Sequence, residues 1–390
     1  MHVPPEGHFK SASSEAESVL KAVIADSNQT MATATLLPPA AYTSQAFYDL
    51  EVQRIFKRDW LCVGHVSQVA NVGDYFTLDL LGELLVVVRA KDRIRVLSRV
   101  CLHRWAQVVS GEGNKKAFVC PFHGWTYALD GQLMNAMFMD QAAGFEPSKC
   151  QLPEVRSEIV EALGLIFITF ADKIDSINER LGDLSARPKN YHMNELTAVK
   201  PGDTDDPFNW KIGISTGMEI YHHFVAHRET FERTHPTRNS QCEEKKRGWT
   251  VCHAGAAGDG RRSAELPFFP DLQDEEKKRM DLYYIYPSVR LIVYPDTVRV
   301  RVIIPIGPAR TKTKGFNLVR PEVAAQPELI QSAFASTQKF MQQVGREDDE
   351  ISLMQQRGAS SALACAGRIS HHEVAVWHLA EYVRARIAAD

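Results

Sequence analysis

Two short segments of this chain each contain one cysteine and one histidine, and together they could hold a metal cofactor. The first supplies Cys101 and His103, and the second supplies Cys120 and His123. Two thiolates and two imidazoles suit a [2Fe–2S] cluster in which the cysteines bind one iron and the histidines bind the other. They also suit structural zinc, but zinc sites usually pair Cys with Cys and His with His along the sequence. Because each segment supplies one of each, the pattern favours the iron–sulfur cluster.

The residues around these ligands carry a family resemblance. The segments CLHR and CPFHGWTY are similar to the Rieske [2Fe–2S] domain of the ring-hydroxylating oxygenases, in particular to the alpha subunit, the terminal oxygenase component. Trp105 follows Arg104 where that family usually has glycine. This departure should alter the surface around the cluster.

Short apolar and β-branched runs flank the two segments. Tyr75–Leu80, Leu84–Arg89 and Ile94–Ser98 are separated by Gly82 and by a Lys-Asp pair, which is typical of an antiparallel meander. Leu163–Phe170 predicts a further buried strand. Such a sheet can present two ligand-bearing loops.

A Rieske cluster transfers electrons and does not activate O₂, so an oxygenase needs a second metal downstream. Asn209-Trp210-Lys211 precedes Glu219, His222, His223 and His227. Two imidazoles and one carboxylate form the facial triad of non-haem Fe(II) oxygenases. The stretch resembles the family pattern NWK…(Glu/Asp)-x-Tyr-His-x₄-His, which identifies His222 and His227 as iron ligands.

The adjacent histidines leave an ambiguity. On an ideal helix His223 and His227 are separated by about 40°, whereas His222 and His227 are separated by about 140°. Simple geometry therefore favours His223, and the family resemblance favours His222. A π-bulge or a helix end would reconcile His222 with a shared metal.

The resemblance also assigns two carboxylates. An acidic run at 346–350, followed by Gln356-x-Gly358, resembles the family stretch in which an Asp ligates iron, here Asp348. Asp349 is the alternative, as is a solvated acidic turn after a helix over Leu329–Val344. Glu219 resembles the carboxylate that bridges an iron-ligating His to a cluster-ligating His of the neighbouring subunit.

One further departure concerns the substrate site. Ser215 and Thr216 occupy positions where the family usually has an acidic residue and an asparagine. An amide near the iron is therefore missing.

The amino-acid composition argues against some classes of binding partner. The chain has 390 residues, 44% of them hydrophobic and 24% charged, and a net charge of −3. These values argue against nucleic acid or an anionic membrane as partner. No apolar run approaches the roughly 18 residues of a membrane span, and the N-terminus lacks a secretory pattern. Seven scattered cysteines, two of them assigned to the cluster, suit a reducing cytoplasm rather than a disulfide framework.

The predicted fold class is α+β, with two domains. An all-β Rieske domain should precede an antiparallel sheet folded around a long helix, the helix-grip arrangement implied by the resemblance. Leu282–Pro308 predicts two strands of that sheet. The expected divisions are a mobile arm at 1–41, an N-terminal helix packing with the catalytic domain at 42–59, the Rieske domain at 60–171, and the mononuclear iron domain at 172–390.

The resemblance implies a terminal oxygenase that uses O₂ to hydroxylate or dihydroxylate a small organic substrate, with an aromatic compound expected. The chain lacks a Gly-rich dinucleotide fingerprint, so a separate NAD(P)H-dependent reductase or ferredoxin should supply electrons. A homotrimer would bring one chain's cluster beside the next chain's iron. Two alternatives remain: N-demethylation of a quaternary ammonium compound at the same site, and a non-enzymatic Rieske electron carrier fused to a ligand-binding module.

Overall fold

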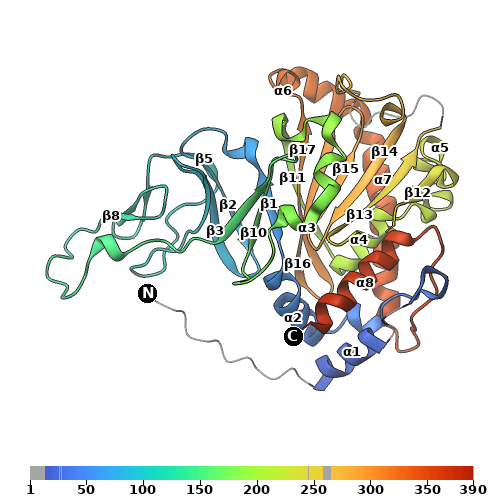
Figure 1. The fold of residues 1–390 in the computed structure, drawn as a ribbon, viewed down its shortest axis with the longest axis horizontal. Helices are drawn as coiled ribbons and strands as arrows, with labels where there is room; N and C mark the ends of the chain where they lie inside the picture. Colours follow the sequence, from blue (N-terminus) through green and yellow to red (C-terminus); the bar gives the residue numbers. More distant parts are fainter. Residues whose placement is uncertain (1–13, 26, 28, 245, 258–264, 390) are drawn as a thin grey trace.

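The computed structural model describes residues 14–25, 27, 29–244, 246–257 and 265–389. Figure 1 shows a β-rich part at one end and a broad antiparallel sheet with helices at the other. The predicted α+β class, an all-β domain followed by a sheet-and-helix domain, is confirmed.

The first domain contains three small antiparallel sheets, with strand orders β4-β3-β2-β5, β6-β7-β8 and β1-β10-β9. Each of the four strands predicted from sequence is present, with ends within two residues of the expected ones. The strands are β1 (Leu61–His65), β2 (Asp74–Leu80), β3 (Glu83–Arg89), β4 (Ile94–Ser98), β5 (Glu112–Asn114), β6 (Phe118–Val119), β7 (Thr126–Tyr127), β8 (Leu133–Asn135), β9 (Arg156–Val160) and β10 (Leu165–Thr169).

The β2–β4 sheet is buried on both faces. Phe76 and Val87 belong to the main hydrophobic core, whereas Tyr75 and Val86 belong to a second cluster that also contains Cys101. Successive side chains of a strand point to opposite faces. The continuous apolar run of β3 therefore supports the main core with one face and the cysteine-bearing loops with the other.

The second domain is built on a seven-stranded antiparallel sheet of order β11-β17-β16-β15-β14-β13-β12. The segment predicted to form two strands contains three, because a turn at 294–297 separates β15 from β16. The strands are β11 (Thr197–Asp206), β12 (Ser240–Cys242), β13 (Trp249–Gly255), β14 (Arg279–Ile285), β15 (Val289–Val293), β16 (Val298–Gly307) and β17 (Arg310–Val319).

Helices cover this sheet, and the longest is α7. Helix α4 contacts strands β14 and β16 as well as α7 and α8, so it lies between the sheet and the outer helices. The predicted helix end at Val344 is wrong, since α7 continues to Ala359 and includes the acidic run. The helices are α1 (Ser14–Ala25), α2 (Gln45–Arg54), α3 (Ile177–Leu181), α4 (Trp210–Met218), α5 (Phe231–Thr234), α6 (Pro321–Ala324), α7 (Pro327–Ala359) and α8 (Val374–Ala388).

The N-terminal segment is more ordered than expected. Val19 and Val23 of α1 belong to the main core, and Arg384 of α8 donates a hydrogen bond to the Val23 carbonyl at 3.2 Å. The prediction of a mobile arm is therefore wrong for α1, and residues 1–13 lie outside the described residues. Burial of the valine stripe explains why this short amphipathic helix is held in place.

Two of the cysteines are bonded. Cys242 and Cys252 face each other on β12 and β13 and form a disulfide, so the expectation of unbonded cysteines is wrong for this pair.

Among the described residues, no helix combines the length and the apolar character that crossing a bilayer would require.

Candidate metal centres

The two cysteine–histidine loops have the same backbone geometry. The Cys101 amide donates to the Ala106 carbonyl and the Cys120 amide donates to the Trp125 carbonyl, both at 2.8 Å. Trp105 and Gly124 occupy equivalent positions, each four residues after a cysteine, and both have positive φ, at 61° and 71°. The fold therefore requires a left-handed residue at each place. This explains why glycine is usual at the first position, and Trp105 adopts the same conformation at the cost of some backbone strain.

The arrangement of the four predicted cluster residues is compatible with a cluster bound by both cysteine and histidine. Cys101 and Cys120 are unbonded and buried, whereas His123 is exposed. The His103 and His123 rings are 4.7 Å apart, and His103 stacks on Trp125 at 4.9 Å. The Nδ1 atom of His103 is buried and makes no hydrogen bond among the described residues. An orphaned imidazole nitrogen beside two free thiols fits a cluster ligand.

Tyr127 is a residue of this site that the sequence did not reveal. Its hydroxyl lies 3.3 Å from Cys101 Sγ and accepts a hydrogen bond from the Leu102 amide at 3.1 Å. Burial, followed by the hydrogen bond to Cys101, raises the pKa of the Tyr127 hydroxyl. The hydroxyl therefore keeps its proton and can donate to a cluster-bound sulfur, a contact that tunes the potential of such clusters.

Helix α4 is anchored at its start. The Asn209 side chain caps the helix by accepting from the Lys211 amide at 3.0 Å, and the Asn209 amide donates to the Gln356 side chain of α7 at 2.8 Å. These contacts fix α4 against α7.

The chain leaves the α-helix before it reaches the histidines. Helix α4 ends at Met218, Glu219 is extended, and Tyr221–Phe224 forms a 3₁₀ turn. The Glu219 carboxylate accepts from the His222 amide at 3.1 Å and contacts His222 Nδ1 at 2.5 Å. The ideal-helix comparison that favoured His223 therefore does not apply, because no continuous helix joins these residues.

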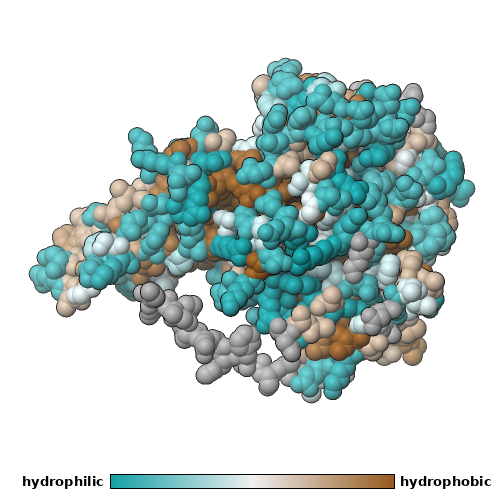
Figure 2. Space-filling model, in the orientation of Figure 1, coloured by the Kyte–Doolittle hydropathy of each residue, from teal (hydrophilic) through white to brown (hydrophobic). Residues whose placement is uncertain are grey.

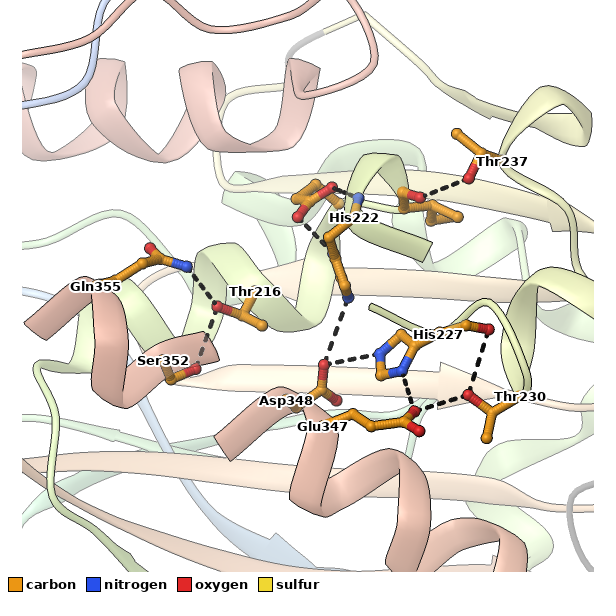
Figure 3. Close-up of polar contacts among 11 residues, drawn as sticks. Thr216, His222, His227, Thr230, Thr237, Glu347, Asp348, Ser352 and Gln355 are labelled. Atoms are coloured by element: carbon orange, nitrogen blue, oxygen red, sulfur yellow. Dashed lines mark hydrogen bonds and ion pairs between the residues drawn. The ribbon is translucent and has the colours of Figure 1, made fainter. Parts of the chain in front are cut away.

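His222, His227 and Asp348 converge (Figure 3). Asp348 Oδ1 lies 3.0 Å from His227 Nε2 and 3.4 Å from His222 Nε2. His222 Nε2 is buried and makes no hydrogen bond of acceptable geometry within the described residues. Two imidazole nitrogens and one carboxylate oxygen thus face a common point, which is the donor set of a facial triad.

His223 also lies in this region, but it is oriented differently. Its metal-binding nitrogen is within 4.8 Å of those of His222 and His227. The His223 ring stacks on Phe231 at 5.4 Å, and no contact with Asp348 at hydrogen-bonding distance is present. The alternative carboxylate, Asp349, is exposed. The convergence on Asp348 favours His222 over His223.

Glu347 is a second residue that sequence reasoning missed. Its Oε2 accepts from His227 Nδ1 and from Thr230 Oγ1, each at 2.7 Å (Figure 3). Glu219 and Glu347 therefore lie behind the two histidines, one carboxylate for each ring. Such a carboxylate fixes the tautomer and orientation of a metal-bound imidazole.

The electrostatics of the triad reflect these contacts. Burial alone would lower the pKa of His222, but the contacts with the negatively charged Asp348 and Glu219 raise it to about 9. Burial alone would raise the pKa of Asp348, yet its contacts with His222 and His227 hold that pKa below its ordinary value. The carboxylate is therefore ionised and available to a cation.

A cavity of about 730 Å³ adjoins the triad. His222, His227 and Asp348 form part of its wall, and Thr216 lines it in place of the missing family amide. Thr216 Oγ1 lies 3.2 Å from Ser352 Oγ. The threonine is thus tied to α7, and the cavity is large enough for a small organic molecule beside the triad.

Comparisons with known proteins agree with this arrangement. The Rieske [2Fe-2S] domain matches residues 59–147, and the ring hydroxylating alpha subunit (catalytic domain) matches residues 193–389. The oxygenase subunit of carnitine monooxygenase from Escherichia coli (strain K12) is 35% identical over 195 residues, 49% of this chain and 52% of that protein. The alpha subunit of biphenyl dioxygenase from Paraburkholderia xenovorans (strain LB400) is 35% identical over 204 residues, 48% of this chain and 44% of that protein.

A solved structure of a quaternary ammonium Rieske monooxygenase is similar in fold, with a TM-score of 0.76, 25% identity, and coverage of 90% of this chain and 95% of that chain. The chain spans about half the length of the curated relatives it matches. The matched regions contain both candidate metal centres. This chain belongs to the family of Rieske-type ring-hydroxylating oxygenase alpha subunits.

Proposed function

We propose that the chain is the terminal oxygenase component of a multicomponent Rieske oxygenase. The observation that carries this proposal is the convergence of His222, His227 and Asp348 at the wall of a cavity. A chain that also carries a Rieske domain then has both an electron-transfer centre and a site for O₂ chemistry.

Each set of residues has a defined part in the proposal. Cys101 and Cys120 hold one iron of the [2Fe–2S] cluster, and His103 and His123 hold the other. His222, His227 and Asp348 hold a mononuclear Fe(II), which supplies O₂ activation when bound. Glu219 and Glu347 orient the two imidazoles and support their basicity. The cavity wall positions the substrate and limits the entry of water.

The reaction proposed is hydroxylation or dihydroxylation of a small organic substrate, with electrons from a separate NAD(P)H-dependent reductase or ferredoxin. An aromatic substrate is supported by the similarity to a biphenyl dioxygenase alpha subunit. N-demethylation of a quaternary ammonium compound is the second candidate, supported by the similarity to a carnitine monooxygenase subunit.

A head-to-tail homotrimer completes the proposal. Trp105, Phe122 and Phe138 are large, exposed apolar side chains in the two cysteine–histidine loops and just after β8, and we call them the tip patch. In Figure 1 the β8 end of the Rieske domain lies away from α7, so one chain's cluster is remote from its own triad. Figure 2 shows pale-brown residues at this end, and darker brown ones between the two domains and near the bottom of the view.

A second apolar surface lies on the catalytic domain. Tyr221, Phe224 and Val225 are exposed beside His222, and we call them the outer patch. Glu219 borders both the triad cavity and another cavity of about 370 Å³. Contact of the tip patch with the outer patch of the next chain would bury both apolar surfaces and bring a cluster histidine to Glu219. Head-to-tail contacts of this kind close into a ring when the rotation between neighbouring chains permits it.

Iron quantitation tests the metal sites. Wild-type protein should contain about three irons per chain, two in the cluster and one in the triad. Alanine at His222, His227 or Asp348 should lower the count to about two and abolish turnover while leaving the Rieske absorption intact, because the cluster ligands are untouched. Alanine at Cys101 should instead abolish that absorption.

His223→Ala is the matched control, since it removes a neighbouring imidazole that does not contact Asp348. It should retain about three irons. Loss of iron from this variant, with retention in His222→Ala, would overturn the ligand assignment. A wild-type protein with only about two irons would leave the electron carrier as the better description. Turnover with a surrogate reductase, assayed for diols and formaldehyde, separates ring oxidation from demethylation.

A further inference from the structure

Two arginines of the large sheet face the triad cavity without a carboxylate partner. Arg290 of β15 and Arg301 of β16 line the cavity, and they stand directly opposite each other in the antiparallel register. Like charges at opposed positions of adjacent strands are destabilising. No ion pair to either side chain occurs within the described residues, and Arg290 Nε is buried without a hydrogen bond.

A third cation lies on the same face. Arg299 is two residues before Arg301, lines the same cavity and packs over the Tyr294 ring at 5.5 Å. Burial, followed by the neighbouring charges of Arg299 and Arg290, lowers the pKa of Arg301 to about 9. Burying the opposed Arg290 and Arg301 side chains is costly unless an anion compensates for their charge.

The two carboxylates that influence Arg290 electrostatically, Asp348 and Asp206, do not provide this compensation. Neither forms an ion pair with Arg290. Asp348 is already engaged by His222 and His227. Asp206 Oδ2 accepts hydrogen bonds from Thr204 and Thr313.

Two glycines make room for the guanidinium groups. A side chain at Gly217 of α4 would overlap the Arg290 guanidinium, and a Cβ at Gly315 would lie 3.0 Å from Arg301 Nη1. Arg301 Nη1 is further held by the carbonyl of Val300 at 2.9 Å. The fold thus accommodates both cations at the cavity wall, with Arg301 anchored by the backbone.

We propose that the cavity selects small organic acids, whose ionised carboxylate is held by Arg290 and Arg301. The carbon skeleton would lie along the apolar wall of Leu282, Ile292 and Phe334, within the same cavity as the triad. A planar guanidinium fork matches a carboxylate in a two-point contact. This substrate class rests on the proposed oxygenase function, and it disfavours an uncharged hydrocarbon or a simple organic cation as the substrate.

Binding measurements on the purified holoprotein test the proposal without relying on turnover. Isothermal titration calorimetry would compare benzoate, benzyl alcohol and benzyltrimethylammonium, and then hexanoate, hexan-1-ol and hexylammonium. Each acid should bind at least about 10-fold more tightly than the alcohol of the same skeleton, and the ammonium compounds should bind most weakly.

Substitutions then locate the acid group. Arg290→Gln and Arg301→Gln should each weaken acid binding by about 10-fold or more and leave alcohol binding nearly unchanged. Gly217→Ala should reproduce the Arg290→Gln result, because it displaces that guanidinium. Arg310→Gln is the control, since Arg310 is an exposed arginine of the same sheet that pairs with Asp205.

Equal binding of acids and alcohols, tighter binding of the ammonium compounds, or equal effects of Arg310→Gln and Arg290→Gln would overturn the acid site. The iron content distinguishes this failure from failure of the oxygenase proposal. Acid binding with about two irons per chain would retain the acid site and remove the oxygenase, whereas about three irons without acid preference would do the reverse.

Discussion

Replacing Glu347 by glutamine should weaken iron binding at the triad although Glu347 is not itself a predicted ligand. Glu347 Oε2 accepts from His227 Nδ1 and Thr230 Oγ1, and its Oε1 accepts from Gln343 Nε2 at 2.8 Å. Both carboxylate oxygens are therefore acceptors. A glutamine has only one acceptor oxygen, so either orientation of its amide would place an NH₂ group against a donor.

The expected magnitude follows from this contact. Loss of the carboxylate behind a metal-bound imidazole typically lowers metal affinity by about 10- to 100-fold. That range corresponds to about 1.4 to 2.8 kcal/mol of binding free energy. His227 is only 1% exposed, so water cannot readily replace the lost acceptor.

Chelator competition would measure the effect. Holoprotein would be titrated with an Fe(II) chelator while the Rieske absorption reports on the intact cluster. Glu350→Gln is the matched control, because it removes the same charge from an exposed position on the same helix. Wild-type iron retention in Glu347→Gln, or equal loss in Glu350→Gln, would refute the assigned role of Glu347.

Two further substitutions test the assembly and the route of electrons. When Fe(II) is supplied in excess so that the triad is filled, Glu219→Gln should retain both metals and the trimer but slow the oxidation of the reduced cluster by O₂ in the presence of substrate, because the charge behind His222 is lost. Wild-type cluster oxidation in stopped-flow absorption would exclude the bridging role. Trp105→Gly should weaken the trimer in sedimentation experiments, because it deletes a side chain that is 81% exposed in the tip patch. The same change should not lower the thermal unfolding temperature, since glycine accepts the positive φ at this position; an unchanged trimer would remove Trp105 from the interface.

The sequence predicted those strands whose positions follow from a local pattern of apolar and turn residues. The β2, β3 and β4 strands could be located because alternating or continuous apolar runs ended at turn residues. The end of α7 could not be located, because the acidic run at 346–350 has the composition of a solvated turn. Glu347 and Asp348 of this run contact His227, a tertiary contact that composition does not encode.

For a similar reason, the sequence did not predict that α1 packs as an ordered helix. A valine stripe in a Ser- and Ala-rich segment is too short to indicate a stable helix by itself. Val23 is held by packing against the main core and by Arg384, which lies more than 350 residues further along the chain. Only the folded arrangement brings those partners together.

The choice between His222 and His223 shows how local geometry can mislead. Angular separation on an ideal helix favours His223, but α4 ends at Met218 and Glu219 is extended. The Glu219 carboxylate accepts from the His222 amide and contacts His222 Nδ1, so the residue that follows the helix end also orients the ring. The family pattern carried this information as spacing, without stating its physical cause.

Helix α7 performs a parallel task for the other imidazole. Consecutive helical residues are separated by about 100° around the axis, so Glu347 and Asp348 can reach different sides of one ring. Glu347 contacts His227 Nδ1 while Asp348 contacts His227 Nε2. A continuous helix through 346–350 is required for this arrangement, because a turn would not hold the two carboxylates in fixed relation. The helical conformation at 346–350, which composition did not predict, therefore positions both Asp348, the proposed iron ligand, and Glu347, which contacts the neighbouring ligand His227.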